Sequence, residues 1–221
     1  MKKWNLIDQT SSPGGAVVSL HEHDGAYSIR VGATELMSTR RHASEDKIAE
    51  FACAHLKNKR SARVLIGGLG LGFTLQSALA TLRPDAAVVV AEILPAVVAW
   101  NRNPAFPLAG AALADPRVTI LQQDVLDVIR DARAAFDSII LDVDNGPAAL
   151  TIGGNATLYG DAGLRLIRTA LKPGGCAAFW SASPNAAFEK SFARAGFEVA
   201  AHRCRAHPTS GAWHTVFTGV R

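Results

Sequence analysis

The stretch RVLIGGLGLGF, residues 63–73, decides the fold of this 221-residue chain. Its apolar run at residues 64–66 is typical of a buried strand, and a helical pattern begins at Phe73. The glycines between them let the backbone approach a ligand closely, and they direct backbone amides and a helix N-terminus toward it. We therefore predict a strand–loop–helix unit with a ligand at the loop.

Strands and helices alternate from this unit to the C-terminus. Apolar runs predict further strands at residues 88–90, 118–121, 138–141 and 176–180, and helical patterns lie at 73–82, 95–101, 125–133, 161–171 and 184–195. Continuous apolar strands are typical of a parallel sheet covered on both faces. The last two strands, near residues 197–201 and 213–219, lack an intervening helix and should pair antiparallel at one edge. The sequence predicts an α/β fold with a doubly wound, seven-stranded, mostly parallel sheet.

The N-terminal region has a different pattern. Short β-prone runs at residues 16–20 and 27–31 flank the turn sequence HDG at residues 23–25, which predicts a hairpin. Ser44 is the predicted N-cap of a helix with acids in its first turn. An exposed edge of this β-region could pair between subunits as a homodimer. We predict two units, a small β-hairpin and helix region (1–62) and a ligand-binding α/β domain (63–221).

The composition argues against several classes of protein. The chain is 48% hydrophobic and 19% charged, which is ordinary for a globular domain. No uncharged apolar run reaches the roughly 18 residues that a membrane span needs, and no secretory signal is recognisable. The 3 cysteines lack CxxC spacing, so we expect no disulfide framework, no metal and a cytoplasmic location.

The net charge of +4 suggests a nucleic-acid partner at first sight. The 23 Lys and Arg are, however, spread along the chain against 19 acids. The one dense basic stretch, residues 57–63, precedes an apolar strand and is predicted to be a solvated loop. We therefore expect no nucleic-acid partner.

The glycine spacing distinguishes between nucleotide-binding motifs. The dinucleotide fingerprint GxGxxG needs a glycine where Phe73 stands, which disfavours an NAD-dependent oxidoreductase. The GxGxG spacing resembles motif I of class I S-adenosylmethionine-dependent transferases. We predict that Gly67, Gly68, Gly70 and Gly72 contact the cofactor; alternatively, they only let the helix pack closely on the strand.

Two acids after the next strands point to a nucleoside site. Glu92 follows the second predicted strand and could accept both ribose hydroxyls. Asp124 follows the third, where the transferase fold reaches the adenine amino group; alternatively, it caps the helix that begins at Val125. Because successive parallel strands end at one edge of a sheet, we expect these acids to lie near the glycine loop.

The order of the motifs resembles the spermidine synthase family, the polyamine aminopropyltransferases and their methyltransferase-fold relatives. The resemblance covers nearly the whole chain. It rests on residues 64–72, VAEILPAV at 90–97, DPRV at 115–118, FDSIILD at 136–142, LYG at 158–160 and LKPGG at 171–175. It implies the class I methyltransferase fold and the use of S-adenosylmethionine or decarboxylated S-adenosylmethionine.

The chain departs from the synthases at three places. Synthases carry an aspartate inside the glycine loop, which can pair with the amine of the decarboxylated cofactor, where this chain has Gly70. The segment DVDNGP at residues 142–147 is shorter, with its second carboxylate displaced to Asp144. Glu45 and Asp46 stand near the place of the family's histidine. These departures favour methyl transfer over aminopropyl transfer.

Carboxylates are the expected catalytic groups. Transfer from a sulfonium requires in-line alignment on carbon, and a carboxylate takes or orients the proton of an amine or hydroxyl nucleophile. We predict that Asp142 and Asp144 have this role; alternatively, they cap the turn at residues 145–147. Tyr159 and Trp180 are predicted to contact the substrate, and packing in the core is the alternative for both.

The leading hypothesis is an S-adenosylmethionine-dependent methyltransferase acting on a small or amine-bearing acceptor. The second is transfer of an aminopropyl group from decarboxylated S-adenosylmethionine to a diamine. The third is a non-catalytic nucleoside-binding or interaction protein. Comparing the binding of the two cofactors separates the first two hypotheses, and turnover separates both from the third.

Overall fold

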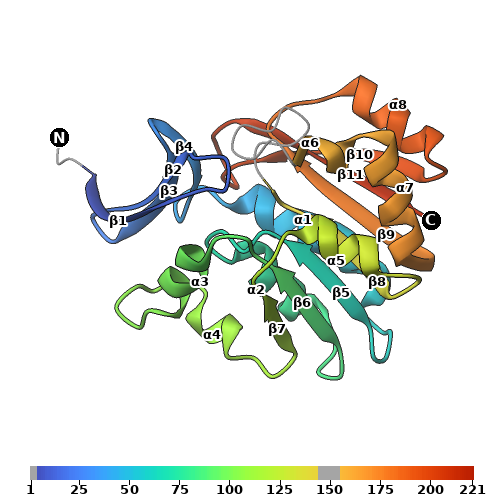
Figure 1. Ribbon diagram of the computed structural model, residues 1–221, viewed down its shortest axis with the longest axis horizontal. Coiled ribbons are helices and arrows are strands. Elements are labelled where there is room, and N and C mark those ends of the chain that lie inside the picture. The colour runs from blue at the N-terminus through green and yellow to red at the C-terminus, as the bar shows by residue number, and fades with distance from the viewer. Residues whose placement is uncertain (1–3, 144–154) are drawn as a thin grey trace.

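The computed structural model describes residues 4–143 and 155–221, which form two sheets (Figure 1). The strands of the larger sheet are β5 (Arg63–Gly67), β6 (Ala87–Ala91), β7 (Val118–Leu121), β8 (Phe136–Leu141), β9 (Leu171–Ser181), β10 (Glu198–Arg205) and β11 (Trp213–Val220). Their order is β10-β11-β9-β8-β5-β6-β7. β11 pairs antiparallel with β9 and β10, and the remaining pairs are parallel. The predicted doubly wound, seven-stranded α/β sheet is confirmed.

Helices cover both faces of this sheet. The helices are α1 (Ala43–Cys53), η1 (Ala54–Leu56), α2 (Phe73–Thr81), α3 (Pro95–Arg102), α4 (Gly110–Leu113), α5 (Val125–Asp131), α6 (Asn155–Tyr159), α7 (Asp161–Ala170) and α8 (Ala186–Arg194). Ile66 of β5 belongs to the core that contains Leu75 of α2, whereas its neighbour Leu65 belongs to the core that contains Ile129 of α5. Since successive strand residues face opposite sides, burial on both faces explains the continuous apolar runs.

The N-terminal residues form a separate antiparallel sheet. Its strands, each paired with the next, are β1 (Asn5–Ser11), β2 (Val17–His23), β3 (Ala26–Val31) and β4 (Thr34–Ser38). The predicted hairpin is confirmed, because Asp24 and Gly25 turn the chain between β2 and β3 with φ of +48° and +76°. The indole of Trp100 in α3 donates a hydrogen bond to Asp8 Oδ2 at 2.7 Å and ties β1 to the larger unit. The division after residue 62 stays a prediction.

The predicted N-cap of α1 is wrong. The helix begins at Ala43, its N-cap is His42, and Ser44 lies inside the first turn. The Ser44 hydroxyl instead contacts the Glu45 carboxyl group and the imidazole of His214 in β11. Local sequence could not indicate this, because the imidazole comes from a strand 170 positions away.

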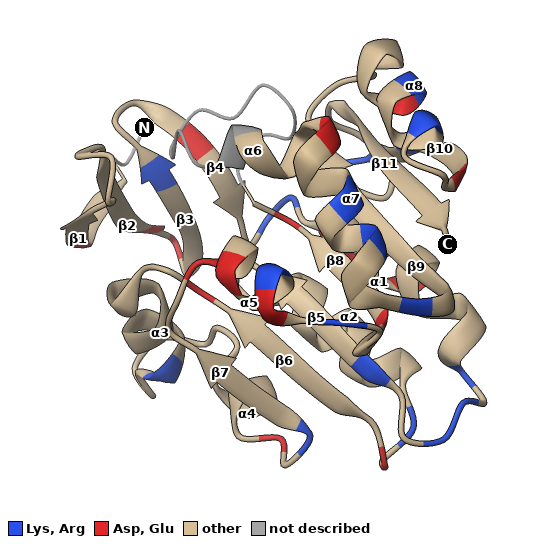
Figure 2. Ribbon diagram, turned by 45° about the vertical axis from the view of Figure 1, so that its right-hand side comes forward, with Lys and Arg blue, Asp and Glu red and all other residues tan. Residues whose placement is uncertain are grey.

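Figure 2 shows Lys and Arg positions scattered over several elements, among them α7 and α8. Within the basic stretch at residues 57–63, the Lys59 ammonium pairs with Asp137 Oδ1 at 2.8 Å, and the Arg63 guanidinium lies 5.6 Å from the centre of the Phe136 ring. Part of that stretch is therefore engaged at the start of β8 rather than wholly solvated. None of the helices in the described ranges combines the length and apolar character that crossing a bilayer requires.

Candidate functional site

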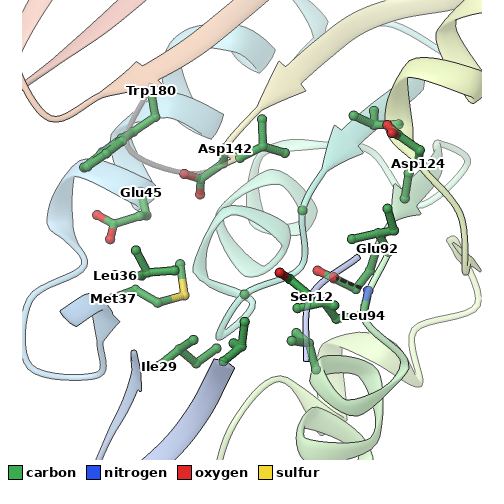
Figure 3. Close-up of a pocket in the computed structure, with 18 of the residues that line it drawn as sticks. Ser12, Ile29, Leu36, Met37, Glu45, Glu92, Leu94, Asp124, Asp142 and Trp180 are labelled. Atoms are coloured by element: carbon green, nitrogen blue, oxygen red, sulfur yellow. Dashed lines mark hydrogen bonds between the residues drawn. The ribbon is translucent and has the colours of Figure 1, made fainter. Parts of the chain in front are cut away.

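The carboxyl ends of β5, β6 and β8 border a pocket of about 140 Å³. In the sheet, β5 lies between β8 and β6. The strands that follow β5 are added first on one side (β6, β7) and then on the other (β8), so the strand order reverses at β5. Open α/β sheets bind ligands at such a reversal point. Residues of the N-terminal sheet, among them Met37 of β4, supply the facing wall. Figure 3 shows Glu92 and Asp124 on one side of the pocket and Glu45, Asp142 and Trp180 on the other.

The four glycines at the end of β5 and in the loop that follows divide into two kinds. Gly68 and Gly70 line the pocket. At Gly68, with φ of +84°, an added Cβ would lie 2.7 Å from the backbone oxygen of Asp142. Gly67 and Gly72 are packing positions, where an added Cβ would come within 2.8 Å of the Leu141 side chain or 2.2 Å of the Ala109 side chain. Gly68 and Gly70 are thus placed to contact a ligand, whereas Gly67 and Gly72 allow close packing around the strand and helix.

Glu92 follows β6 directly, and its carboxylate is held by backbone amides. Oε2 accepts from Leu69 at 2.9 Å and Oε1 from Leu94 at 2.8 Å, and the residue is only 6% exposed. Burial raises its pKa, while the amide hydrogen bonds oppose that shift. Each carboxylate oxygen has a second acceptor position. The amides of Gly70 and Ile93 also act on this carboxylate, so Glu92 is fixed in orientation at the edge of the pocket. The ribose contact stays a prediction.

Asp124 is both a helix cap and a pocket residue, the two alternatives that the sequence left open. Its Oδ1 accepts from the Leu126 amide at 2.8 Å and caps α5. Asp124 also lines the pocket, beside Gln123 and Val125. The cap fixes the side chain, and the remaining acceptor positions are available to an amino group. The adenine contact stays a prediction.

Two carboxyl groups lie at the other end of the pocket. Asp142 follows β8, and its Oδ2 accepts from the Thr74 hydroxyl at 2.7 Å. Burial raises the pKa of Asp142 to about 6 despite that bond. Glu45 comes from α1 and is 5% exposed; burial, then the Asp142 carboxylate, raises its pKa to about 8. A cation that enters the pocket would lower both pKa values and so favour loss of the protons.

Glu45 is connected to a buried hydroxyl and an imidazole. The Ser44 hydroxyl donates to Glu45 Oε2 at 2.5 Å and lies 2.9 Å from His214 Nδ1. The indole of Trp180 lines the pocket and meets the His214 ring edge-on, with centroids 4.6 Å apart. Its Nε1 is buried without a hydrogen-bond partner among the described residues. Trp180 is thus a pocket residue, and its contact with substrate stays a prediction.

The ionisable side chains in the described lining of the pocket are all acidic. The described lining contains four carboxyl groups, those of Glu45, Glu92, Asp124 and Asp142, and no Lys, Arg or His. Carboxylates in an enclosed site attract cations and repel anions. A cationic ligand is therefore favoured over one that carries a carboxylate.

Most amides of the glycine loop are already paired. The Gly68 amide donates to Ala91 O, the Leu69 amide to Glu92, and the Gly72 amide to Leu69 O. The amide of Leu71 points at the sulfur of Met37, 3.0 Å away. These amides cannot bind an anionic group of a ligand without giving up a partner. Among the described residues, no group of three or more His, Cys, Asp or Glu is arranged to hold a metal ion.

The structure places the remaining predicted residues elsewhere. Tyr159 is 7% exposed and packs against Phe179 and Phe188, with its hydroxyl donating to Val143 O at 3.1 Å. That position matches the core alternative, and a direct substrate contact has no support from the lining of the pocket. Asp144 lies outside the described residues. Sequence reasoning missed Glu45 and Met37 as pocket residues, and the only signal was Glu45 near the place of the family's histidine.

Comparison with known proteins places the fold. No protein-family model and no curated protein matches the chain. The solved structures that match include a spermidine synthase in complex with the transition-state analogue AdoDATO and the spermidine synthase from Thermotoga maritima. Each has a TM-score of 0.75 and 14% sequence identity, over 98% of this chain and 72% of the other. The chain therefore has a spermidine synthase-like fold of the class I methyltransferase type, as the sequence resemblance implied.

Proposed function

We propose that this protein transfers an aminopropyl group from decarboxylated S-adenosylmethionine to a small amine acceptor. The observation that carries the proposal is the acidic pocket, whose described lining has no cationic side chain. The donor carries a sulfonium and an ammonium, and the acceptor is an amine, so every charge on these ligands is positive. Ordinary S-adenosylmethionine adds a carboxylate, for which the described lining has no cationic partner.

The arrangement of the pocket supports this assignment. The nucleoside would lie between the glycine loop and Asp124, with its ribose at Glu92, and the acceptor amine would lie toward Glu45 and Asp142. The bound sulfonium supplies an electrophilic carbon and a neutral thioether leaving group. The residues align the amine, hold it near two carboxyl groups and exclude water, and such alignment accounts for a large share of the rate in displacement reactions.

The structural neighbours favour the same choice. Both are spermidine synthases, and they match over nearly the whole chain. The sequence favoured methyl transfer because of Gly70 and the altered segment after β8. The charge of the pocket and the neighbours reverse that preference, and methyl transfer becomes the second candidate. Methyl transfer remains a candidate because of Gly70, since the loop lacks a carboxylate that could pair with the amine of the aminopropyl group.

Calorimetric titration with three nucleosides tests the proposal. We expect decarboxylated S-adenosylmethionine to bind at least about 10-fold more tightly than S-adenosylmethionine, with methylthioadenosine reporting the nucleoside site alone. Glu92→Gln should weaken all three, since the ribose is common to them. Glu50→Gln, on the exposed part of α1, is the matched control and should change none. Equal or tighter binding of S-adenosylmethionine would contradict the proposal.

Product analysis then separates the two transfers. With a diamine as acceptor, aminopropyl transfer releases methylthioadenosine from the decarboxylated donor. Methyl transfer releases S-adenosylhomocysteine from S-adenosylmethionine. The second product without the first would favour methyl transfer. Neither product over a range of amines would favour a non-catalytic nucleoside-binding protein.

A further inference from the structure

A line of hydrogen bonds leads away from the acceptor end of the pocket. It runs from Glu45 Oε2 to the Ser44 hydroxyl at 2.5 Å and on to His214 Nδ1 at 2.9 Å. Glu45 lines the pocket, and Ser44 is fully buried. His214 is half-buried. The line therefore joins the pocket to a partly exposed imidazole near the start of β11.

Ser44 has no role in starting its own helix. The N-cap position of α1 belongs to His42, so the Ser44 side chain is available for a contact across the fold. A serine hydroxyl both donates and accepts, and it can reverse its direction by rotation. Between a carboxyl group and an imidazole, such a hydroxyl can pass a proton either way.

We propose that Glu45 accepts the proton of the acceptor amine, and that Ser44 and His214 carry this proton out of the pocket. The inference rests on the proposed function for the identity of the acceptor. In the transfer, the nitrogen lone pair forms the N–C bond and the C–S electron pair leaves on sulfur. One N–H proton passes to Glu45. A proton then leaves Glu45 for the Ser44 oxygen, while the Ser44 hydroxyl, rotated toward the imidazole, gives its proton to the unprotonated Nδ1 of His214. His214 gives up its Nε2 proton to water, and exchange of its ring protons with water restores the starting tautomer before the next turnover.

The charges around Glu45 fit a base that works on an amine. The groups that face it are the Asp142 carboxyl at the end of β8, Asp46 on its own helix and His214 from β11, with Arg41 near that imidazole. Thr74 from α2 and Trp180 from β9 are uncharged. Burial and Asp142 raise the pKa of Glu45 to about 8, much closer to that of an amine than an ordinary carboxyl group is. A smaller pKa difference makes proton transfer easier.

An NMR titration of the unliganded protein tests the relay without any turnover. The His214 ring signals should show two inflections, one from the imidazole itself and one near pH 8 transmitted from Glu45. Glu45→Gln should remove the second inflection, and Ser44→Ala should weaken it strongly. Glu50→Gln on the same helix is the control and should leave both. A single inflection in the parent protein, or a second one that survives Glu45→Gln, overturns the relay.

Kinetics tests the catalytic part. Glu45→Gln should lower kcat by about 10² to 10⁴-fold and remove the rise of kcat with pH near 8. Ser44→Ala and His214→Asn should each lower kcat by about 10-fold with little change in KM, because they act through Glu45. Ser77→Ala, whose hydroxyl donates to Asp46 O from α2, is the matched control. An unchanged pH profile in Glu45→Gln overturns the assignment.

Binding of methylthioadenosine separates this inference from the proposed function. If the parent protein binds it but the Glu45 and Ser44 variants keep full kcat, the relay is wrong and the proposed function stands. If no amine is aminopropylated by the parent protein, the proposed function fails. The NMR titration then decides alone whether Ser44 connects Glu45 to His214.

Discussion

At the scale of single residues, Glu45 and Asp142 disfavour folding but favour the binding of a cation. A carboxyl group in an enclosed site loses hydration and becomes harder to ionise, and a second carboxyl nearby adds to that effect. The protein keeps both groups at one end of the pocket, with Thr74 and Ser44 as hydrogen-bond partners. Such a pair is unfavourable for folding at neutral pH and favourable for binding a cation, so it points to function.

The cost to folding gives a prediction for Glu45→Gln. The unfolded chain releases this proton near pH 4.5, whereas the folded protein holds it up to about pH 8. Its contribution to stability is therefore complete below pH 4.5 and is lost as the pH rises through 8. We expect the parent protein to lose a few kcal/mol between pH 5 and 9 relative to the variant, measured by urea unfolding. Glu50→Gln should follow the parent protein, and parallel curves for the parent protein and Glu45→Gln would contradict the prediction.

At the scale of elements, the glycine loop joins β5 to α2 under tight packing. Gly72 has φ of +82°, and an added Cβ would lie 2.2 Å from the Ala109 side chain in the connection before α4. Gly15, in the turn between β1 and β2, has the same φ of +82° and open space around it. A substitution would therefore meet the same backbone strain at both positions, and only the packing around them differs.

We therefore expect Gly72→Ala to destabilise the protein more than Gly15→Ala. The left-handed backbone alone should cost about 1–2 kcal/mol at each site. The clash at residue 72 should add about 1–3 kcal/mol, because Ala109 or the loop must move. Chemical unfolding of both variants measures the difference. Equal losses of unfolding free energy would show that the α4 region moves without cost and that a glycine is needed at residue 72 only for its φ.

The elements also show which features could be predicted from local sequence. The strands of the large sheet could be predicted because burial on both faces leaves continuous apolar runs, as at residues 64–66. Glu92 could be predicted because it follows such a strand directly, and Asp124 because it stands three residues after the next strand. Glu45 could not, because it reaches the pocket only when α1 packs beside the end of β8. Ser44 was misassigned for the same reason, since a serine before two acids is a local cap signal and its real partner lies in β11.

At the scale of the whole molecule, the pocket is closed by two parts of the chain. The large sheet supplies the acids and the glycine loop, and the N-terminal sheet supplies an apolar wall that includes Ile29 and Met37. The Met37 sulfur lies over the loop, where an added Cβ at Gly70 would be 2.5 Å from it. The position of the small sheet thus decides how much of the loop a ligand can reach.

Trp100→Phe tests this dependence, because it removes the indole donor to Asp8 and keeps an aromatic ring in the buried site. Losing one hydrogen bond should cost about 1 kcal/mol, and the loss should fall on the attachment of β1. We expect faster amide exchange in β1 and β2, unchanged exchange in β5 and β8, and several-fold weaker binding of methylthioadenosine. Trp213→Phe, at an exposed indole, is the control. If binding weakens while exchange in β1 is unchanged, Trp100 acts through α3 and not through the small sheet.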